Sequence, residues 1–508
     1  MDELNRWARE CGNKLAWSMP ASGVQGGSGV DYATLDFNAN KAAQLLLSLG
    51  LQSGDTVALM LPNCVEMIEL MWAARRLGLY YTPISTRLLA HEVDYILADC
   101  EARVLFLSSD LPGARFDGPR YVVGAGSTDV GASSFTSSRD SYRDYAALPD
   151  APVGKDFVYS SGTTGRPKGV RRQLQPSLAA EQRISDWIQA FSKITERSVC
   201  MLSAPMYHAA PLRFAMRTIQ HGATLLCMPK FDAELSLKNI EDFKVTHSLW
   251  VPTMFYRLLA LPDATRSRHD ISSLELAVHS GGPCSVDIKR RMIEWFGAVV
   301  WEYYAASEGN GATCISPQDA LTHPGSVGKA VLGKLHIMGP AGEELPAGQD
   351  GEIYFEGGPA FEYYRDPEKT AQSRNALGWT AVGDIGHVDA EGFLYLSDRR
   401  AHTIVSGGIN IYPAEIEDVL RSHASVADAA VFGIPNAEFG EEVKAVVEVH
   451  PGVIADAALA DALMRHCRLH LSSFKCPRSV SFEARLPRSD SGKLPKGELK
   501  KRYSQAAG

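Results

Sequence analysis

A strand-like run that leads into a loop rich in glycine and hydroxyl side chains most restricts what this chain can fold into. The run Phe157–Tyr159 precedes the sequence SSGTTGRPKG at residues 160–169. Glycine permits left-handed turns and close approach of a ligand to the backbone, and consecutive turn amides form a nest that binds anions. A polar surface loop would need no lysine beside Pro167, so the pattern predicts a polyphosphate-binding turn with Lys168 as its mobile positive charge. The candidate phosphate-binding residues are Ser160, Ser161, Gly162, Thr163, Thr164, Gly165 and Lys168.

This loop does not follow the common phosphate-loop pattern. Counted from Gly162, that pattern requires Gly-Lys at the positions that Pro167 and Lys168 occupy, and here the glycine comes after the lysine. A phosphate-loop kinase or a simple phosphate-loop hydrolase is therefore disfavoured.

The composition indicates a globular enzyme of several domains. A chain of 508 residues exceeds one ordinary core, so roughly two to four domains or subdomains are expected. The net charge of −8 argues against a nucleic-acid partner, and no apolar run reaches membrane-spanning length. The opening residues 1–4 lack the basic and apolar segments of a secretory signal. The nine cysteines are scattered without a Cys-x-x-Cys pair, which predicts reduced thiols and a cytoplasmic location.

Strand-like and helix-like segments alternate through most of the chain. A buried strand is predicted at Thr56–Leu61 and helices at Glu66–Leu77 and Ser177–Phe191. Further strands are predicted at Val104–Leu107, Phe157–Tyr159, Val199–Leu202, Thr224–Met228 and Ser248–Val251. This alternation predicts an α/β fold in which parallel or mixed sheets are covered by helices.

The pattern changes near Arg399–Ala401. A helix opening at Ala414–Leu420 has acidic residues in its first turn and an apolar face, and strands and a further helix follow it. About a hundred residues with elements of their own make a separate domain. The predicted organisation is a large domain at residues 1–399 and a small α+β domain at residues 400–508.

Five later segments support the loop, and the six together resemble the adenylate-forming superfamily of acyl-CoA synthetases, luciferases and peptide-synthetase adenylation domains. In their expected order, these segments are Ser280–Cys284, Tyr303–Glu308, Val382–Asp384, Asp398–Arg399 and Pro487–Lys496. The resemblance extends from about Asp31 to Lys500. It implies a large ATP- and acid-binding domain and a small mobile lid domain. The sequences HSGGPC at 279–284, GDIGHVDAEGFLYLSDRR at 383–400 and VSGGINIYPAEIE at 405–417 are most similar to those of fatty-acid and steroid or bile-acid CoA ligases.

The resemblance assigns a nucleotide site to the large domain. Gly281, Gly282 and Pro283 would line the adenine, Tyr304 would stack on it next to Ala305, and Ser307 would bind phosphate. Thr164 and Glu308 would hold Mg²⁺, Asp384 would accept from the ribose hydroxyls, and Arg399 would reach the ribose and phosphate. The family usually has glycine where this chain has Ala305 and threonine where it has Ser307.

The resemblance also assigns roles to the small domain. Lys493 would enter the active site and act with Lys168 and Glu308 as a catalytic residue. Ala401 stands where the family carries Asp or Lys as the hinge of its domain rotation, and Gly407 and Gly408 would line the channel for coenzyme A.

The acid pocket is predicted beside Tyr207, His208 and Ala306. Tyr207 and His208 match an aromatic–histidine gate in the family. Asp232 resembles the aspartate with which amino-acid-activating domains hold an α-amino group, but its position favours a helix N-cap. A hydrophobic fatty, aryl or steroid-type acid is therefore expected rather than an amino acid.

The implied activity is that of an AMP-forming acid–thiol ligase, which uses ATP, Mg²⁺ and coenzyme A. An acid attacks the α-phosphorus of ATP, and a thiol then attacks the acyl-adenylate. Fixed positive charge where negative charge develops suits the first step. Two alternatives stay open: an adenylating enzyme that loads a carrier protein, and a nucleotide-binding regulator without chemistry. The expected partners are small molecules, and a homodimer is possible.

Overall fold

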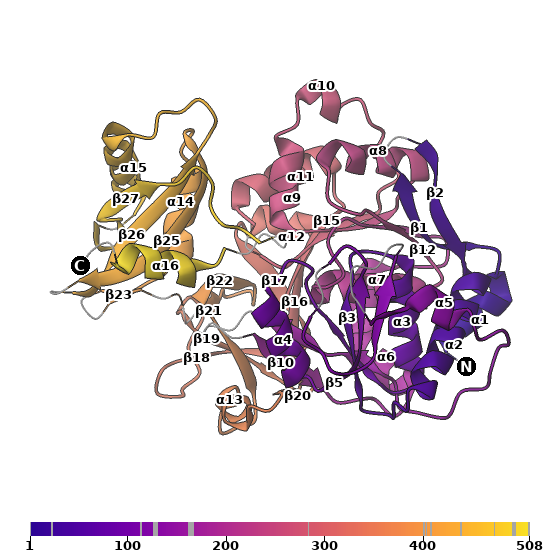
Figure 1. The fold of residues 1–508 in the computed structure, drawn as a ribbon. Helices are drawn as coiled ribbons and strands as arrows, with labels where there is room; N and C mark the ends of the chain where they lie inside the picture. The colour runs from indigo at the N-terminus through magenta and orange to yellow at the C-terminus, as the bar shows by residue number, and fades with distance from the viewer. Residues whose placement is uncertain are drawn as a thin grey trace.

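In the computed structural model, the described residues are 2–21, 24–111, 114–124, 131–160, 167–282, 284–399, 402, 404–406, 409–436, 439–471, 473–489 and 494–505. Three sheets with their covering helices make a large N-terminal body, and a smaller C-terminal body with its own sheet lies to one side of it (Figure 1). This confirms the predicted fold class, a large α/β domain followed by a small α+β domain.

The largest sheet has 13 strands and carries most of the candidate site residues. In spatial order its strands are β18 (Lys334–Met338), β19 (Gly351–Glu356), β21 (Thr380–Val388), β22 (Leu394–Arg399), β17 (Ser326–Leu332), β16 (Ala312–Ile315), β15 (Val300–Ala305), β14 (Leu276–His279), β13 (His247–Trp250), β11 (Val199–Leu202), β12 (Thr224–Cys227), β1 (Leu15–Ala21) and β2 (Val24–Asp31). Five neighbouring strands of this sheet run parallel to one another, namely β11, β12, β13, β14 and β15. All residues of β12, β13 and β14 are buried, which accounts for the two or three consecutive apolar residues in each of these strands.

Two further sheets complete the large body. The six-stranded sheet, in spatial order, contains β7 (Ser133–Ser134), β6 (Arg120–Val123), β5 (Ala102–Ser108), β3 (Thr56–Met60), β4 (Tyr80–Pro83) and β8 (Lys155–Asp156). The three-stranded sheet contains β20 (Phe361–Tyr363), β10 (Lys168–Arg172) and β9 (Val158–Ser160). In the latter, β9 pairs antiparallel with β10, so the strand before the phosphate loop is not part of a parallel layer as the alternation had predicted. The reason is local, because the chain turns straight back after the loop instead of crossing over through a helix.

Helices cover the sheets of the large body (Figure 1). They are α1 (Glu3–Cys11), α2 (Tyr32–Ser48), α3 (Val65–Arg76), α4 (Ala90–Asp99), α5 (Phe135–Arg139), α6 (Leu178–Ser192), α7 (Ala209–Gln220), α8 (Ala233–Phe243), α9 (Pro252–Leu259), α10 (Asp263–Arg266), α11 (Val286–Phe296), α12 (Pro317–Thr322) and α13 (Pro367–Gln372). The Ser177 hydroxyl caps α6 by accepting from the Ala180 amide at 3.2 Å. Asp232 caps α8 by accepting from the Leu235 amide at 2.8 Å, which confirms its predicted N-cap role.

The small body has an independent core. Its sheet contains β24 (Ile409–Ile411), β23 (Ile404–Ser406), β26 (Gly440–Val449), β25 (Val426–Asn436) and β27 (Ser479–Phe482). Its helices are α14 (Pro413–Arg421), which begins with a favourable N1 proline, α15 (Ala457–His470) and α16 (Lys496–Gln505), with a 3₁₀ turn at Ser473–Lys475. Ile416, Leu420, Val431 and Leu463 are fully buried between helices and sheet. The boundary between residues 399 and 400 stays a prediction, because residues 400, 401 and 403 lie outside the described part of the chain.

A buried charged network behind β8 yields a prediction about stability. Lys155 is 5% exposed, and its Nζ lies 4.0 Å from Oε1 of Glu181, a carboxylate that also pairs with Arg75. Burial, aided by the positive charge of Arg172, lowers the pKa of Lys155 from 10.5 to about 8. Below pH 8 the lysine is protonated in both the folded and the unfolded chain. Between pH 8 and pH 10.5 only the unfolded chain keeps the proton, so stability rises with pH.

We therefore expect the free energy of unfolding of the wild type, relative to Lys155→Met, to rise by up to about 3 kcal/mol between pH 7 and pH 11. Urea unfolding at several pH values measures the difference. Lys238→Met is the control, because Lys238 is 44% exposed in an ion pair with Asp242. A wild-type to Lys155→Met difference that does not change with pH would contradict the lowered pKa.

Candidate active site

The two ends of the phosphate loop lie side by side. Ser160 at the end of β9 is directly opposite Lys168 at the start of β10 in the antiparallel register. Residues 161–166 lie outside the described residues, and the predictions for Ser161, Gly162, Thr163, Thr164 and Gly165 stay predictions. The strand pairing nevertheless fixes where the loop begins and ends.

A buried tyrosine connects Lys168 with Glu308. Lys168 Nζ lies 5.8 Å from the ring centroid of Tyr363, within cation–π range. The hydroxyl of the same tyrosine donates to Glu308 Oε1 at 2.8 Å, and both residues are 7% exposed. Tyr363 follows from the pairing of β20 with β10, where it stands opposite Val170. The structure thus brings together the predicted catalytic lysine and the predicted metal ligand of the large domain.

The environment of Glu308 fits Mg²⁺. Proteins usually bind this ion through one or two carboxylates together with substrate phosphates and waters. Among the described residues there is no group of three or more His, Cys, Asp or Glu side chains that could hold a metal by itself. A single buried carboxylate, next to a lysine at the end of a phosphate-type loop, is therefore the arrangement expected for a metal that arrives with a nucleotide.

The residue predicted to stack on adenine and those predicted to bind the ribose lie at one place, where β15 faces the pair β21–β22. The Tyr304 hydroxyl donates to Asp384 Oδ2 at 2.6 Å. Asp384 is 6% exposed and stands directly opposite Arg399 across the pair β21–β22. Gly383 precedes it with a φ of +84°, a conformation that favours glycine. Tyr304, Asp384 and Arg399, which lie far apart in the sequence, are therefore neighbours.

The opposite face of β15 carries aromatic side chains. Successive residues of a strand point to opposite faces, so Tyr303 and Ala305 point away from the side where Tyr304 meets Asp384. The Tyr303 ring lies 6.0 Å from Trp187 and 6.4 Å from Phe191 of α6, and Phe191 stacks on Trp301 at 5.9 Å. We call Trp187, Phe191, Trp301 and Tyr303 the aromatic cluster. Burial raises the pKa of Tyr303, which keeps its phenol neutral.

The predicted gate lies at the start of α7. The rings of Tyr207 and His208 are 4.8 Å apart, and His208 is the N-cap residue of α7. Asn63, which is 6% exposed, fixes this segment: its Oδ1 accepts from the Met206 amide at 2.8 Å and its Nδ2 donates to the Ala204 and Met228 carbonyls. The gate is therefore attached to the ends of β11 and β12.

The turn after β14 contains a glycine that its backbone conformation requires. Gly281 has a φ of +87°, whereas a Cβ placed on it would meet only Val251 Cγ1, at 3.8 Å. A Cβ on Gly282 would meet nothing within 4 Å among the described residues. The predicted contact of this turn with a base stays a prediction, and Pro283 lies outside the described residues.

Cys284 follows the same turn, and burial raises the pKa of its thiol to about 12. Lys493, Ala401, Gly407 and Gly408 lie outside the described residues, so their roles stay predictions.

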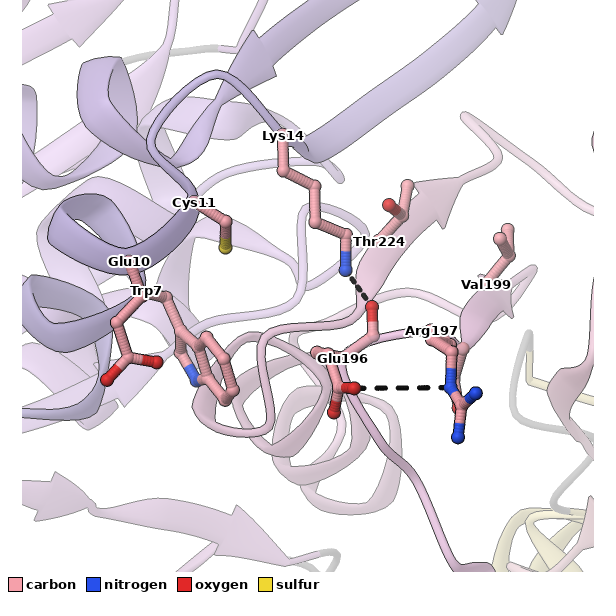
Figure 2. A pocket seen from close by; sticks show the side chains of 9 residues that line it. Trp7, Glu10, Cys11, Lys14, Glu196, Arg197, Val199 and Thr224 are labelled. Carbon is pink, nitrogen blue, oxygen red and sulfur yellow. Dashed lines mark hydrogen bonds and ion pairs between the residues drawn. The ribbon is translucent and has the colours of Figure 1, made fainter.

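A groove of about 750 Å³ lies at the ends of the strands of the largest sheet that are opposite to the candidate site. Trp7, Lys14, Glu196 and Thr224 line it at the amino ends of β11 and β12 (Figure 2). Lys14 Nζ donates to the carbonyls of Glu196 and Gly222, so it joins two segments of the fold. Ligands of parallel α/β sheets bind at the carboxyl ends of the strands, which is where the gate and the Gly281 turn lie. The groove is therefore separate from the candidate site.

Comparison with known families decides the assignment. Residues 4–365 match the family described as AMP-binding enzyme, and residues 415–493 match the AMP-binding enzyme C-terminal domain. The chain belongs to the AMP-binding enzyme family. It is 33% identical to a feruloyl-CoA synthase of Amycolatopsis sp over 94% of this chain and 95% of that protein. It is 32% identical to the long-chain-fatty-acid–CoA ligase FadD13 of Mycobacterium tuberculosis over 93% of each.

A solved structure agrees over the full length. ATP-bound MatB from Rhodopseudomonas palustris superposes with a TM-score of 0.83 at 28% identity and covers 100% of both chains. The predicted resemblance is confirmed, and so are the class of AMP-forming acid–thiol ligase and the use of ATP, Mg²⁺ and coenzyme A by this AMP-binding enzyme. In the described part of the chain, none of the helices has the length and apolar character needed to traverse a bilayer.

Sequence reasoning missed two residues of the site. Tyr363 and Asn63 belong to no motif of the chain, and they acquire their positions only through strand pairing and through hydrogen bonds, respectively. Trp187 lies on the helix predicted at Ser177–Phe191, whose pocket-facing residues were expected to help decide the acid. The one local feature that could have indicated Tyr363 was the run of aromatic residues at 361–364, most of which forms β20.

Proposed function

We propose that this AMP-binding enzyme joins a compact aromatic carboxylic acid to coenzyme A. The observation that carries the proposal is the division of β15 into two faces. One face holds Tyr304 against Asp384, and the other presents Tyr303 toward Trp187 and Phe191. An acid whose carboxylate lies at the end of β15, near Ser307, would place its hydrocarbon part against the aromatic cluster. Offset and edge-to-face contacts between rings favour an aryl acid there.

The first step requires positive charge around the α-phosphate. A carboxylate oxygen of the acid attacks the α-phosphorus of ATP, the bond to the bridging oxygen of pyrophosphate breaks, and pyrophosphate leaves. Lys168 and the loop after Ser160 would bind the phosphates, and Glu308 would hold the metal. When bound, Mg²⁺ neutralises charge on the departing phosphate oxygens. Ser307 would donate its hydroxyl to the phosphate, and Asp384 and Arg399 would bind the ribose.

The second step needs a different arrangement of the small domain. The thiol of coenzyme A attacks the acyl carbon, and the bond to the AMP oxygen breaks. We propose that residues 400–508 rotate about Ala401, withdraw Lys493 and bring Gly407 and Gly408 beside the pantetheine arm. The separate core of the small body supports a rigid rotation of this kind.

The setting of the reaction is also a proposal. The cytoplasm supplies ATP and coenzyme A and would keep the nine cysteines reduced. A homodimer would carry two independent sites, because each residue assigned above comes from one copy of the chain.

A panel of acids tests the substrate class. Acid-dependent release of pyrophosphate from ATP should have its highest specificity constant with cinnamic- or benzoic-type acids, a lower one with fatty acids, and none with amino acids. Trp187→Ala should shift the preference toward longer fatty acids, because it removes one wall of the aromatic cluster. The substrate assignment would fail if a free amino acid were best, or if Trp187→Ala left the order of preference unchanged.

A further inference from the structure

A buried cluster of charges joins three separate pieces of the candidate site. Asp156 of β8 accepts on Oδ2 from Arg213 Nε and Nη2, at 3.1 and 2.8 Å, and on Oδ1 from Arg172 Nη2. The side chain of Asp156 is 6% exposed. Burial opposes the charge on Asp156, but the two arginines outweigh it and hold the pKa of that carboxyl far below its usual range. The carboxylate therefore stays charged and bound on both oxygens.

The same arginines reach the turn that carries Glu308. Arg213 Nη2 also donates to the Ser307 carbonyl at 2.8 Å. Gly309 has a φ of +67°, and a Cβ placed on it would meet Arg172 Nη1 at 3.4 Å, so Arg172 lies along the other end of the turn. The turn is thus bound by the guanidinium group of Arg213, the guanidinium group of Arg172 lies beside it, and both groups pair with Asp156.

Each element in this cluster carries a predicted site residue. Arg172 ends β10, which begins at Lys168; Arg213 lies on α7, which begins after the gate residue His208; and the turn contains Glu308. A buried ion pair contributes little to stability compared with apolar residues of the same volume. Hydrogen bonds from a charged donor, by contrast, are short and directional, which suits a group that must hold a backbone turn in place.

We infer that Arg213 is a positioning residue: through the Ser307 carbonyl and Asp156 it holds the turn so that the Glu308 carboxylate faces Lys168 and the metal–nucleotide complex. The inference rests on the proposed function. It adds a connection between the gate helix, the phosphate-loop strand and the metal ligand.

Metal binding tests this inference without relying on turnover. The affinity for Mn²⁺ in the presence of α,β-methylene-ATP is measured from the EPR signal of free Mn²⁺. Arg213→Met should raise the dissociation constant about 10- to 100-fold, the range found when a residue supporting a metal ligand is lost. Arg213→Lys, which keeps the charge but only one arm, should recover part of the loss. Acyl-adenylate formation should slow by a similar factor, whereas thioester formation from synthetic acyl-adenylate should keep the wild-type rate.

An arginine that pairs with a buried carboxylate elsewhere in the large body provides the control. Arg139 is 8% exposed and pairs with Glu69 at 2.5 Å, on α5 and α3 of the large body. Arg139→Met should reduce stability without changing Mn²⁺ affinity. Asp156→Asn should act in the same direction as Arg213→Met, and the double variant should bind Mn²⁺ no more weakly than the more affected single variant, since the two residues act as a unit.

Two outcomes overturn the inference. One is wild-type Mn²⁺ affinity in folded Arg213→Met; the other is an equal loss of affinity in Arg139→Met. Failure of the proposed function looks different: the wild type would bind Mn²⁺ with the nucleotide analogue but release no pyrophosphate with any acid of the panel.

Discussion

Replacing Lys493 with alanine is expected to slow acyl-adenylate formation about 10²–10³-fold and to leave thioester formation close to the wild-type rate. The reason is that the lysine is proposed to contact the α-phosphate only while negative charge develops on it. After rotation of the small domain it should lie far from the acyl carbon. An interaction made only in one transition state affects only that step.

The two half-reactions are measured separately in the same variant. Rapid-quench release of pyrophosphate in the absence of coenzyme A reports the first, and conversion of synthetic acyl-adenylate with coenzyme A reports the second. Equal losses in both would mean that Lys493 supports the fold of the small domain or that this domain does not alternate. Full activity in both would make Lys493 a solvated lysine.

Two neighbouring lysines control for structural effects. Lys496 Nζ lies 2.8 Å from Glu417 Oε1 in a largely buried pair, so Lys496→Ala should lower the melting temperature of the small domain without separating the two half-reactions. Lys500 is 45% exposed in an ion pair with Glu441, and Lys500→Ala should change neither rate. A selective effect of Lys493→Ala against this background can be assigned to the chemistry.

Much of the fold followed from local patterns in the sequence. Fully buried strands such as β12 and β14 contain three consecutive apolar residues, and an aspartate before a helical pattern predicts a cap, as Asp232 shows. Lys168 could be singled out because its loop combines glycines and hydroxyls at the end of a strand. These signals depend on residues within a few positions of one another.

Features that depend on distant pairing could not be predicted in this way. The alternation of elements does not specify strand partners, so β9 was expected in a parallel layer although it pairs antiparallel with β10. Tyr363 reaches Glu308 only because β20 joins the same small sheet. In the sequence, Arg213 is one more polar residue of an amphipathic helix. Only the structure shows that it donates to Asp156 and to the Ser307 carbonyl.

Glu308→Gln is expected to reduce kcat/KM for acyl-adenylate formation about 10²–10³-fold and to raise the Mg²⁺ concentration needed for half-maximal rate. The amide can still accept the hydrogen bond from Tyr363, and its volume is almost unchanged. What it lacks is the negative charge that binds a divalent cation. A Mg²⁺ titration of pyrophosphate release measures the effect. Thioester formation from acyl-adenylate should be unaffected, because no phosphate charge has to be neutralised as the thiol attacks.

Tyr363→Phe separates the charge of Glu308 from its placement. This variant removes the 2.8 Å hydrogen bond and keeps the carboxylate and the ring beside Lys168. Loss of a hydrogen bond to a charged group is worth about 1.5–3 kcal/mol, or roughly 10- to 100-fold, so Tyr363→Phe should be less damaging than Glu308→Gln. If the two variants were equally slow, the placement of the carboxylate by the hydroxyl would matter as much as its charge. If Glu308→Gln kept the wild-type Mg²⁺ dependence, Glu308 would be a buried structural carboxylate, and the metal would have to be bound by the nucleotide and other residues.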